Sequence, residues 1–120
     1  MAAKQPVPDL VKIRALVDTG ASCTCVDPSV LSALGLTPTG SAMMVTPSTG
    51  STPHQTDQYD VALVIGASSA SQPPLVVPTL AVVASELLSR QGFHALIGRD
   101  VLRRCILNYN GSSGFFTLAY

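Results

Sequence analysis

The sequence predicts a mainly β protein with two short helices, on three observations. Apolar and polar residues alternate with the period of a strand along residues 10–17 and again along residues 59–65. Stretches rich in Pro, Gly, Ser and Thr, which favour turns, separate the apolar runs. Only two short segments, beginning near Asp27 and Asp100, carry the start signal of a helix.

Length and composition indicate a compact protein without a charged binding surface. The chain has 120 residues, of which 47% are hydrophobic and 12% are charged, and this balance suits one domain over residues 1–120. Its formal net charge is zero, so no nucleic acid partner is expected. Residues 61–85 are uncharged, but Pro73, Pro74 and Pro78 interrupt them, so this segment is not expected to insert into a membrane.

The N-terminus indicates where the protein is located, and the cysteines and histidines indicate whether it binds a metal. The N-terminus lacks the charged, apolar and small-residue order of a signal peptide, which favours an intracellular location. Cys23, Cys25 and Cys105 are an odd number, so we expect reduced thiols. Cys-x-Cys is not a common zinc spacing, and His54 and His94 are isolated, so neither a metal nor a cofactor is expected.

The first half of the chain predicts a strand, a helix and a hairpin. The strand over residues 10–17 leads directly into Asp18. Asp27 and Pro28 predict the start of a helix, and Gly35 predicts its end. A strand over residues 43–46 is followed by a turn-rich stretch over residues 47–53 and by a returning strand that ends near Ile65. These segments form a β-hairpin with an exposed tip.

The second half predicts two more strands, a short helix and a terminal hairpin. Residues 75–84 form an apolar strand that tolerates Pro78 only at a sheet edge or a bulge. A strand over residues 95–97 ends at Gly98, and Asp100 is expected to cap a helix through Cys105. Residues 106–109 and 115–120 form a hairpin, whose turn we attribute to positive φ at the Asn110-Gly111 pair.

The triplet Asp18-Thr19-Gly20 is the main candidate for chemistry. It places a carboxylate at a strand end, where glycine permits a close backbone approach and the threonine hydroxyl can brace the loop. By itself the triplet is a weak signal, because average residue usage produces it by chance in roughly one chain of this length in fifty. Its meaning therefore depends on the surrounding sequence.

Two segments resemble the signatures of aspartic proteases. Residues 15–22, Ala-Leu-Val-Asp-Thr-Gly-Ala-Ser, resemble the active-site signature, and residues 95–102, Ala-Leu-Ile-Gly-Arg-Asp-Val-Leu, resemble the second signature. With the hairpin between them, the chain is similar to retropepsin-like, single-lobe aspartic proteases from about residue 10 to residue 120. The resemblance implies a closed, barrel-like fold with a flap hairpin that closes over substrate.

The resemblance also implies roles for particular residues. Asp18, Thr19 and Gly20 would form the catalytic motif, and three residues of the second signature would support it, namely Gly98, Arg99 and Asp100. Substrate would contact the loop residues Ala21 and Ser22, the strand residues Leu96 and Ile97, and the flap residues Thr46, Pro47, Ser48, Thr49 and Gly50.

Peptide hydrolysis of this kind needs two carboxylates that share one proton, one acting as a base on water and the other as an acid on the carbonyl oxygen. The chain contains one Asp-Thr-Gly motif. We therefore expect a required homodimer in which two copies of Asp18 hydrolyse an extended peptide or protein substrate.

Two departures from the family pattern bear on the site. Two-lobed members usually carry Ser or Thr at Ala21, and losing that hydroxyl donor favours the protonated form of the carboxylate pair, which predicts a mildly acidic optimum. Retroviral members carry an acidic residue at Ser22, which can pair with the arginine matching Arg99. Here Arg99 must contact another group, such as Asp27, Asp100 or a main-chain carbonyl.

Two other functions use the same fold differently. One is a non-catalytic module for dimerisation or peptide binding, against which the intact Asp18-Thr19-Gly20 motif argues. The other is a redox-regulated domain that uses Cys23, Cys25 and Cys105. Loss of peptide cleavage in Asp18→Asn, without loss in cysteine variants, would distinguish the protease from both.

Overall fold

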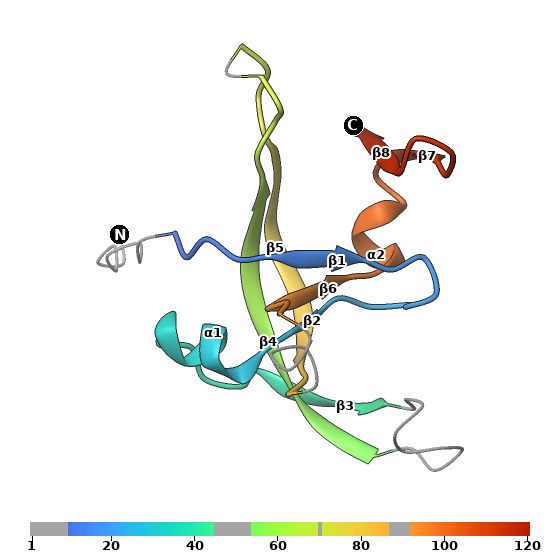
Figure 1. Cartoon of the computed structure of the whole chain (residues 1–120). Helices are drawn as coiled ribbons and strands as arrows, with labels where there is room; N and C mark the ends of the chain where they lie inside the picture. Colours follow the sequence, from blue (N-terminus) through green and yellow to red (C-terminus); the bar gives the residue numbers. More distant parts are fainter. Residues whose placement is uncertain (1–9, 45–53, 70, 87–91) are drawn as a thin grey trace.

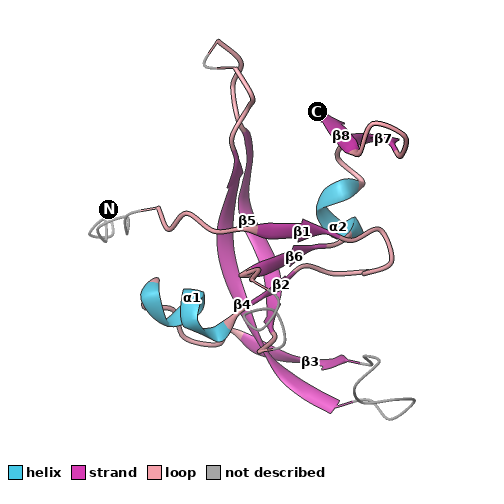
Figure 2. Ribbon diagram, viewed as in Figure 1, coloured by secondary structure: helices cyan, strands magenta, loops and turns pink. Residues whose placement is uncertain are grey.

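The structure is a computed structural model that describes residues 10–44, 54–69, 71–86 and 92–120. In chain order its elements are β1 (Ala15–Val17), β2 (Cys25–Val26), α1 (Pro28–Ala33), β3 (Gly40–Met44), β4 (His54–Ile65), β5 (Leu75–Ala84), β6 (Ala95–Ile97), α2 (Arg99–Leu102), β7 (Ile106–Asn110) and β8 (Phe115–Ala119). Six strands form one curled sheet in the order β1-β6-β2-β5-β4-β3, and β7 and β8 form a second sheet (Figures 1 and 2). This mainly β half-barrel with two short helices confirms the expected fold class.

The short strands β1, β6 and β2 lie side by side and position the loop that contains Asp18. β6 pairs with β1 in parallel and with β2 antiparallel, so it separates the two strands that this loop joins. Residues 18–24 must therefore cross the C-terminal end of β6, where Gly98 and α2 follow. The expected strand over residues 10–17 is shorter, because only Ala15–Val17 pairs with β6.

The long strands β4 and β5 form the antiparallel hairpin that crosses the molecule in Figure 1. Val61 lies opposite Leu80 and Leu63 lies opposite Val77, so Pro78 and Thr79 face a single residue of β4. This bulge shifts the alternation by one residue, so that Val77 and Leu80 are both buried although they are three positions apart. The expectation that Pro78 lies at an edge or a bulge is confirmed.

Helix α1 begins and ends where the sequence predicted. Asp27 is its N-cap, and its carboxylate accepts a hydrogen bond from the backbone N–H of Ser29 at 2.9 Å. Gly35 ends the helix with a φ of 69°, and Leu36 N–H donates to Leu31 C=O at 3.2 Å, which forms a Schellman motif. Val30 and Leu31 turn inward and join the core between α1 and the sheet.

The core is apolar and is shared by the sheet and both helices. Its buried members come from β2, α1, β5, β6 and α2, namely Val26, Val30, Leu31, Val77, Leu80, Val82, Ala95, Ile97, Val101 and Leu102. Ile97 lies within two residues of α2 and one strand away from Asp18, so the core extends directly beneath the candidate site. Among the described residues, no helix is long and apolar enough to cross a membrane.

The C-terminal hairpin is confirmed, but its predicted turn is wrong. Asn110 pairs with Phe115 as the last residue of β7, so the connection is residues 111–114 and begins one residue later than the expected turn over 110–114. Positive φ falls at Gly114, at 74°, and not at Asn110 or Gly111. The Asn110 side chain instead accepts a hydrogen bond from the backbone N–H of Ser113 at 3.0 Å, which closes the wider turn.

Candidate active site

Asp18 is the first residue beyond β1 and is held at the end of the sheet. Its backbone N–H donates to the C=O of Ile97 at 3.0 Å, which extends the β1–β6 pairing by one residue. The Asp18 side chain is half-buried and is therefore accessible to water. The core beneath it, including Ile97, gives this carboxylate a rigid support.

The Asp-Thr-Gly turn holds the Asp18 carboxylate through its own backbone. The N–H of Gly20 donates to Asp18 Oδ1 at 2.8 Å, and the N–H of Ala21 donates to the C=O of Asp18 at 3.3 Å. A Cβ added at Gly20 would lie 3.2 Å from the same Oδ1, tighter than usual. Glycine therefore allows the close approach that the motif predicted.

The second signature is held against this turn by two hydrogen bonds from Arg99. Its backbone N–H donates to the C=O of Ala21 at 2.8 Å, and its Nη1 donates to the C=O of Thr19 at 3.0 Å. Of the partners considered from the sequence, Arg99 thus uses a main-chain carbonyl. Both ends of the turn around Gly20 are therefore tied to the start of α2.

Gly98 is buried against the loop that carries Asp18. A Cβ at this position would lie 2.5 Å from the backbone oxygen of Cys23 and 3.0 Å from that of Ala21. Its φ is −93°, which any residue can adopt, so the requirement for glycine is steric. Any larger residue would push the loop that carries Asp18 away from β6.

Thr24 and Asp100 form a hydrogen-bonded pair behind the loop. The backbone N–H of Thr24 donates to Asp100 Oδ2 at 2.9 Å, and its hydroxyl donates to Oδ1 at 2.8 Å. The same hydroxyl accepts a hydrogen bond from the N–H of buried Gly98 at 3.2 Å. Thr24 is only 1% exposed, so its hydroxyl connects the end of the Asp18 loop to the second signature inside the protein.

This pair corrects the prediction that Asp100 caps α2. The N-cap is Gly98, and Asp100 lies in the first turn of the helix. Its Oδ1 does accept a hydrogen bond from the N–H of Val101 at 2.9 Å, but both oxygens also bind Thr24. The helix is also shorter than expected, because it ends at Leu102 and residues 103–105 form a turn.

The other candidate site residues are placed as follows. Ser22 is exposed and Ala21 is half-buried in the loop, whereas Leu96 and Ile97 lie on β6 beside β1. The flap candidates Thr46, Pro47, Ser48, Thr49 and Gly50 lie outside the described residues. The described parts of the hairpin pair antiparallel from Gly40 with Gln58 to Met44 with His54, and so lead toward that segment.

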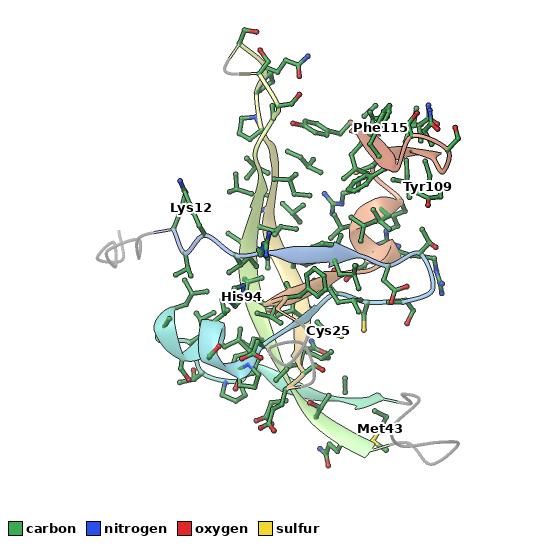
Figure 3. All side chains as sticks on the ribbon, viewed as in Figure 1. Lys12, Cys25, Met43, His94, Tyr109 and Phe115 are labelled. Carbon is green, nitrogen blue, oxygen red and sulfur yellow. The ribbon has the colours of Figure 1, made fainter. Side chains whose placement is uncertain are left out.

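Cys23 and Cys25 lie near carboxylates, and both thiols lose their protons less readily than an ordinary cysteine does. The pKa of Cys25 is raised to about 12, mainly by burial and to a smaller extent by the nearby Cys23, Asp100 and Asp18. Burial, and then the charge of Asp100, also raise the pKa of Cys23. Figure 3 shows Cys25 near the middle of the molecule. No group of three or more His, Cys, Asp or Glu side chains among the described residues could hold a metal ion.

Two residues important to this geometry were not identified from the sequence. The first is Thr24, which in the sequence looks like any other threonine, so nothing there shows that its hydroxyl is buried. The second is His94. Its side-chain Nδ1 accepts a hydrogen bond from the backbone N–H of Arg14 at 3.2 Å, and its backbone N–H donates to the C=O of Arg14 at 2.8 Å. Both act across about 70 or more positions of chain, so no local pattern reveals them.

Comparison with known proteins agrees with this geometry. The model of an aspartyl protease family matches residues 7–101, a span that includes the first signature and all but the last residue of the second. The chain therefore belongs to this retropepsin-like family of aspartyl proteases. No curated protein and no solved structure gives a significant match.

Proposed function

We propose that the chain is an aspartic endopeptidase whose active form is a homodimer, with one Asp18 from each protomer as the catalytic pair. The observation that carries this proposal is the anchoring of Asp18. Its Oδ1 accepts a hydrogen bond from Gly20, and the turn around it is tied to α2 by Arg99. A half-buried carboxylate held in one orientation at a strand end is suited to act on water.

The reaction needs a second carboxylate, and the other described aspartates have different structural positions. Asp27 caps α1, Asp100 binds Thr24, and Asp57 and Asp60 are exposed on β4. None of them follows a strand with the Thr-Gly turn that holds Asp18. A two-fold axis beside Asp18 would supply the missing carboxylate as Asp18 of the partner subunit.

In this dimer the two carboxylates would share one proton. The ionised carboxylate removes a proton from water as the water oxygen attacks the scissile carbonyl carbon, and the protonated one donates to the carbonyl oxygen. Transfer of a proton to the amide nitrogen then breaks the C–N bond. The β3–β4 hairpin, with residues 46–50 at its tip, would close over an extended substrate bound between the protomers.

The sharpest test of a shared site mixes active and inactive chains. Asp18→Asn preserves the size of the side chain but removes the carboxylate, so the homogeneous variant should lose peptide cleavage. When equal amounts of wild-type and variant chains are unfolded and refolded together, random pairing leaves roughly a quarter of the full dimer activity. A protease that works as a monomer would keep roughly half.

Control measurements separate activity from assembly. Sedimentation of the wild-type and Asp18→Asn chains should show the same dimer, since the substitution leaves the backbone hydrogen bond between Asp18 and Ile97 intact. A pepstatin-like transition-state analogue should block cleavage by the wild type. Full cleavage by a homogeneous Asp18→Asn sample would refute the proposal, and a stable dimer of wild-type chains without any cleavage would favour the non-catalytic module.

A further inference from the structure

An apolar groove lies along one face of β1, and Ile97 of the neighbouring strand β6 is part of its lining. Its volume is about 510 Å³, and its walls come from the residues around β1, the outer end of β4, the turn that follows it, and β8. Figure 1 shows the C-terminal hairpin standing beside the outer half of the β4–β5 hairpin. Tyr120 Oη donates a hydrogen bond to the C=O of Pro73 at 3.0 Å, which ties these two parts together.

The groove is distinct from the candidate active site. Of the described residues assigned to catalysis or substrate binding, only Ile97 contributes to its lining. Neither Asp18 nor the loop residues Ala21 and Ser22 reach it. A molecule bound here would therefore contact Ile97, which supports the loop that carries Asp18, but it would not lie next to the Asp18 carboxylate.

One wall of the groove is β1, and one edge of this strand pairs with no other described strand. Among the described residues, β1 is at the end of the six-stranded sheet and pairs with β6 alone. Asp18 N–H and Arg14 C=O both bind β6, so the alternation of a strand directs the N–H and C=O of Ala15 and Val17 to the opposite edge. The side chains of Ala15 and Val17 line the groove.

The remaining lining is uncharged. Ile13, Ala15 and Val17 face the groove, whereas the charged Lys12 and Arg14 alternate with them and are not part of its lining. Leu63, Ile65 and Phe116 contribute apolar side chains from the other walls. Among the described residues, no Asp, Glu, Lys or Arg lines the groove, so an uncharged occupant suits it.

We propose that this groove binds an extended, uncharged segment of a partner protein, which adds as a strand to the free edge of β1. Main-chain hydrogen bonds to Ala15 and Val17 would hold the segment, and every second side chain, small and apolar, would enter the groove. Fifteen of the described residues line the groove, fewer than the roughly 20–30 per side of a stable interface between folded proteins. The groove thus suits one strand better than a folded second copy.

The test uses amide hydrogen exchange of the Asp18→Asn chain, which cannot cut the probe. The probe is the blocked peptide acetyl-Thr-Val-Thr-Val-Thr-Val-amide, which is uncharged and alternates apolar residues. In the free protein the amides of Ala15 and Val17 should exchange rapidly, and saturating probe should slow them at least about tenfold. The same peptide with each valine replaced by lysine should leave them unchanged.

The chain supplies a matched pair of variants as controls. Phe116 and Phe115 are neighbours in β8 and are similarly exposed, at 49% and 54%, but only Phe116 lines the groove. Phe116→Asp should weaken the probe-dependent protection at least about tenfold, because it places a charge in the groove, whereas Phe115→Asp should not. Equal effects of the two variants would overturn the proposal.

Three other outcomes would also overturn it. In the first, the probe does not alter exchange at Ala15 and Val17. In the second, these amides are protected without probe and the protection grows with protein concentration, which shows that a second copy covers the edge. In the third, they are protected at every concentration, which shows that the chain covers its own edge. None of these outcomes depends on whether the protein is a protease.

Discussion

Replacing Thr24 with valine removes a hydroxyl from the contact between the Asp18 loop and the second signature without changing the volume of the side chain. Thr24 is 1% exposed, so water cannot take the place of this hydroxyl. Asp100 Oδ1 loses the hydrogen bond of 2.8 Å, and the buried N–H of Gly98 loses its acceptor at 3.2 Å. The backbone hydrogen bond from Thr24 to Asp100 Oδ2 remains.

The expected cost follows from these two losses. A hydrogen bond to a carboxylate contributes about 1.5–3 kcal/mol, and a buried N–H without an acceptor costs about 1–3 kcal/mol. We therefore expect Thr24→Val to lower the free energy of unfolding by about 2.5–6 kcal/mol, a large share of the stability of an ordinary domain. Peptide cleavage should fall too, because the hydroxyl holds the loop of Asp18 against the start of α2.

Urea unfolding followed by circular dichroism measures this effect, with the protomer concentration held constant because a dimer is expected. Thr24→Ser is the matched control, since it keeps the hydroxyl and loses one methyl group, at a cost of roughly 1 kcal/mol. If valine and serine at position 24 gave the same urea midpoint, the hydroxyl would not connect the Asp18 loop to the second signature and our reasoning about this contact would be wrong.

Three further variants test neighbouring features. Gly98→Ala places a Cβ 2.5 Å from the backbone oxygen of Cys23, and should lower kcat/KM about 100-fold by displacing the loop; normal cleavage would contradict the steric argument. Arg99→Met removes the hydrogen bond to Thr19 C=O and should reduce cleavage about tenfold. The free energy of unfolding should change by less than about 1 kcal/mol, because the side chain is exposed. A large loss of stability would count against a role of Arg99 in positioning the loop. The pKa of Cys25 is raised from 9.0 to about 12, so the thiol loses its proton at lower pH in the unfolded chain than in the folded one. The free energy of unfolding should therefore fall as the pH rises between these two values, and it should fall less steeply in Cys25→Ala. Equal urea midpoints at about pH 8 and about pH 11 in the wild type would contradict this sign.

Features that depend on neighbouring residues could be predicted from the sequence. The start of α1 at Asp27 and its end at Gly35 follow from hydrogen bonds within a few residues of each end. The bounds of β5 and the irregularity at Pro78 follow from an apolar run and from the missing N–H of proline. These local rules are satisfied in the structure.

Predictions failed where a distant or neighbouring group competed with the local rule. Asp100 has the sequence context of an N-cap, but its carboxylate binds Thr24, which is 76 positions away. Asn110 and Gly111 have the composition of a two-residue turn, but β7 continues through Asn110 and moves the positive φ to Gly114. Strand β2 was not predicted, because its two residues form a strand only by lying between β5 and β6.

The sequence alone predicted the family and singled out the candidate catalytic motif, because Asp-Thr-Gly and the second signature are short patterns whose residue types are required by local chemistry. It also led to the prediction that a second carboxylate comes from a partner chain. Only the tertiary structure decided how the motif is held, through Gly98 against Cys23, Arg99 on Thr19, and Thr24 on Asp100. These contacts join residues about 75–80 positions apart, and a pairing over such separations depends on the path of the whole chain around β6.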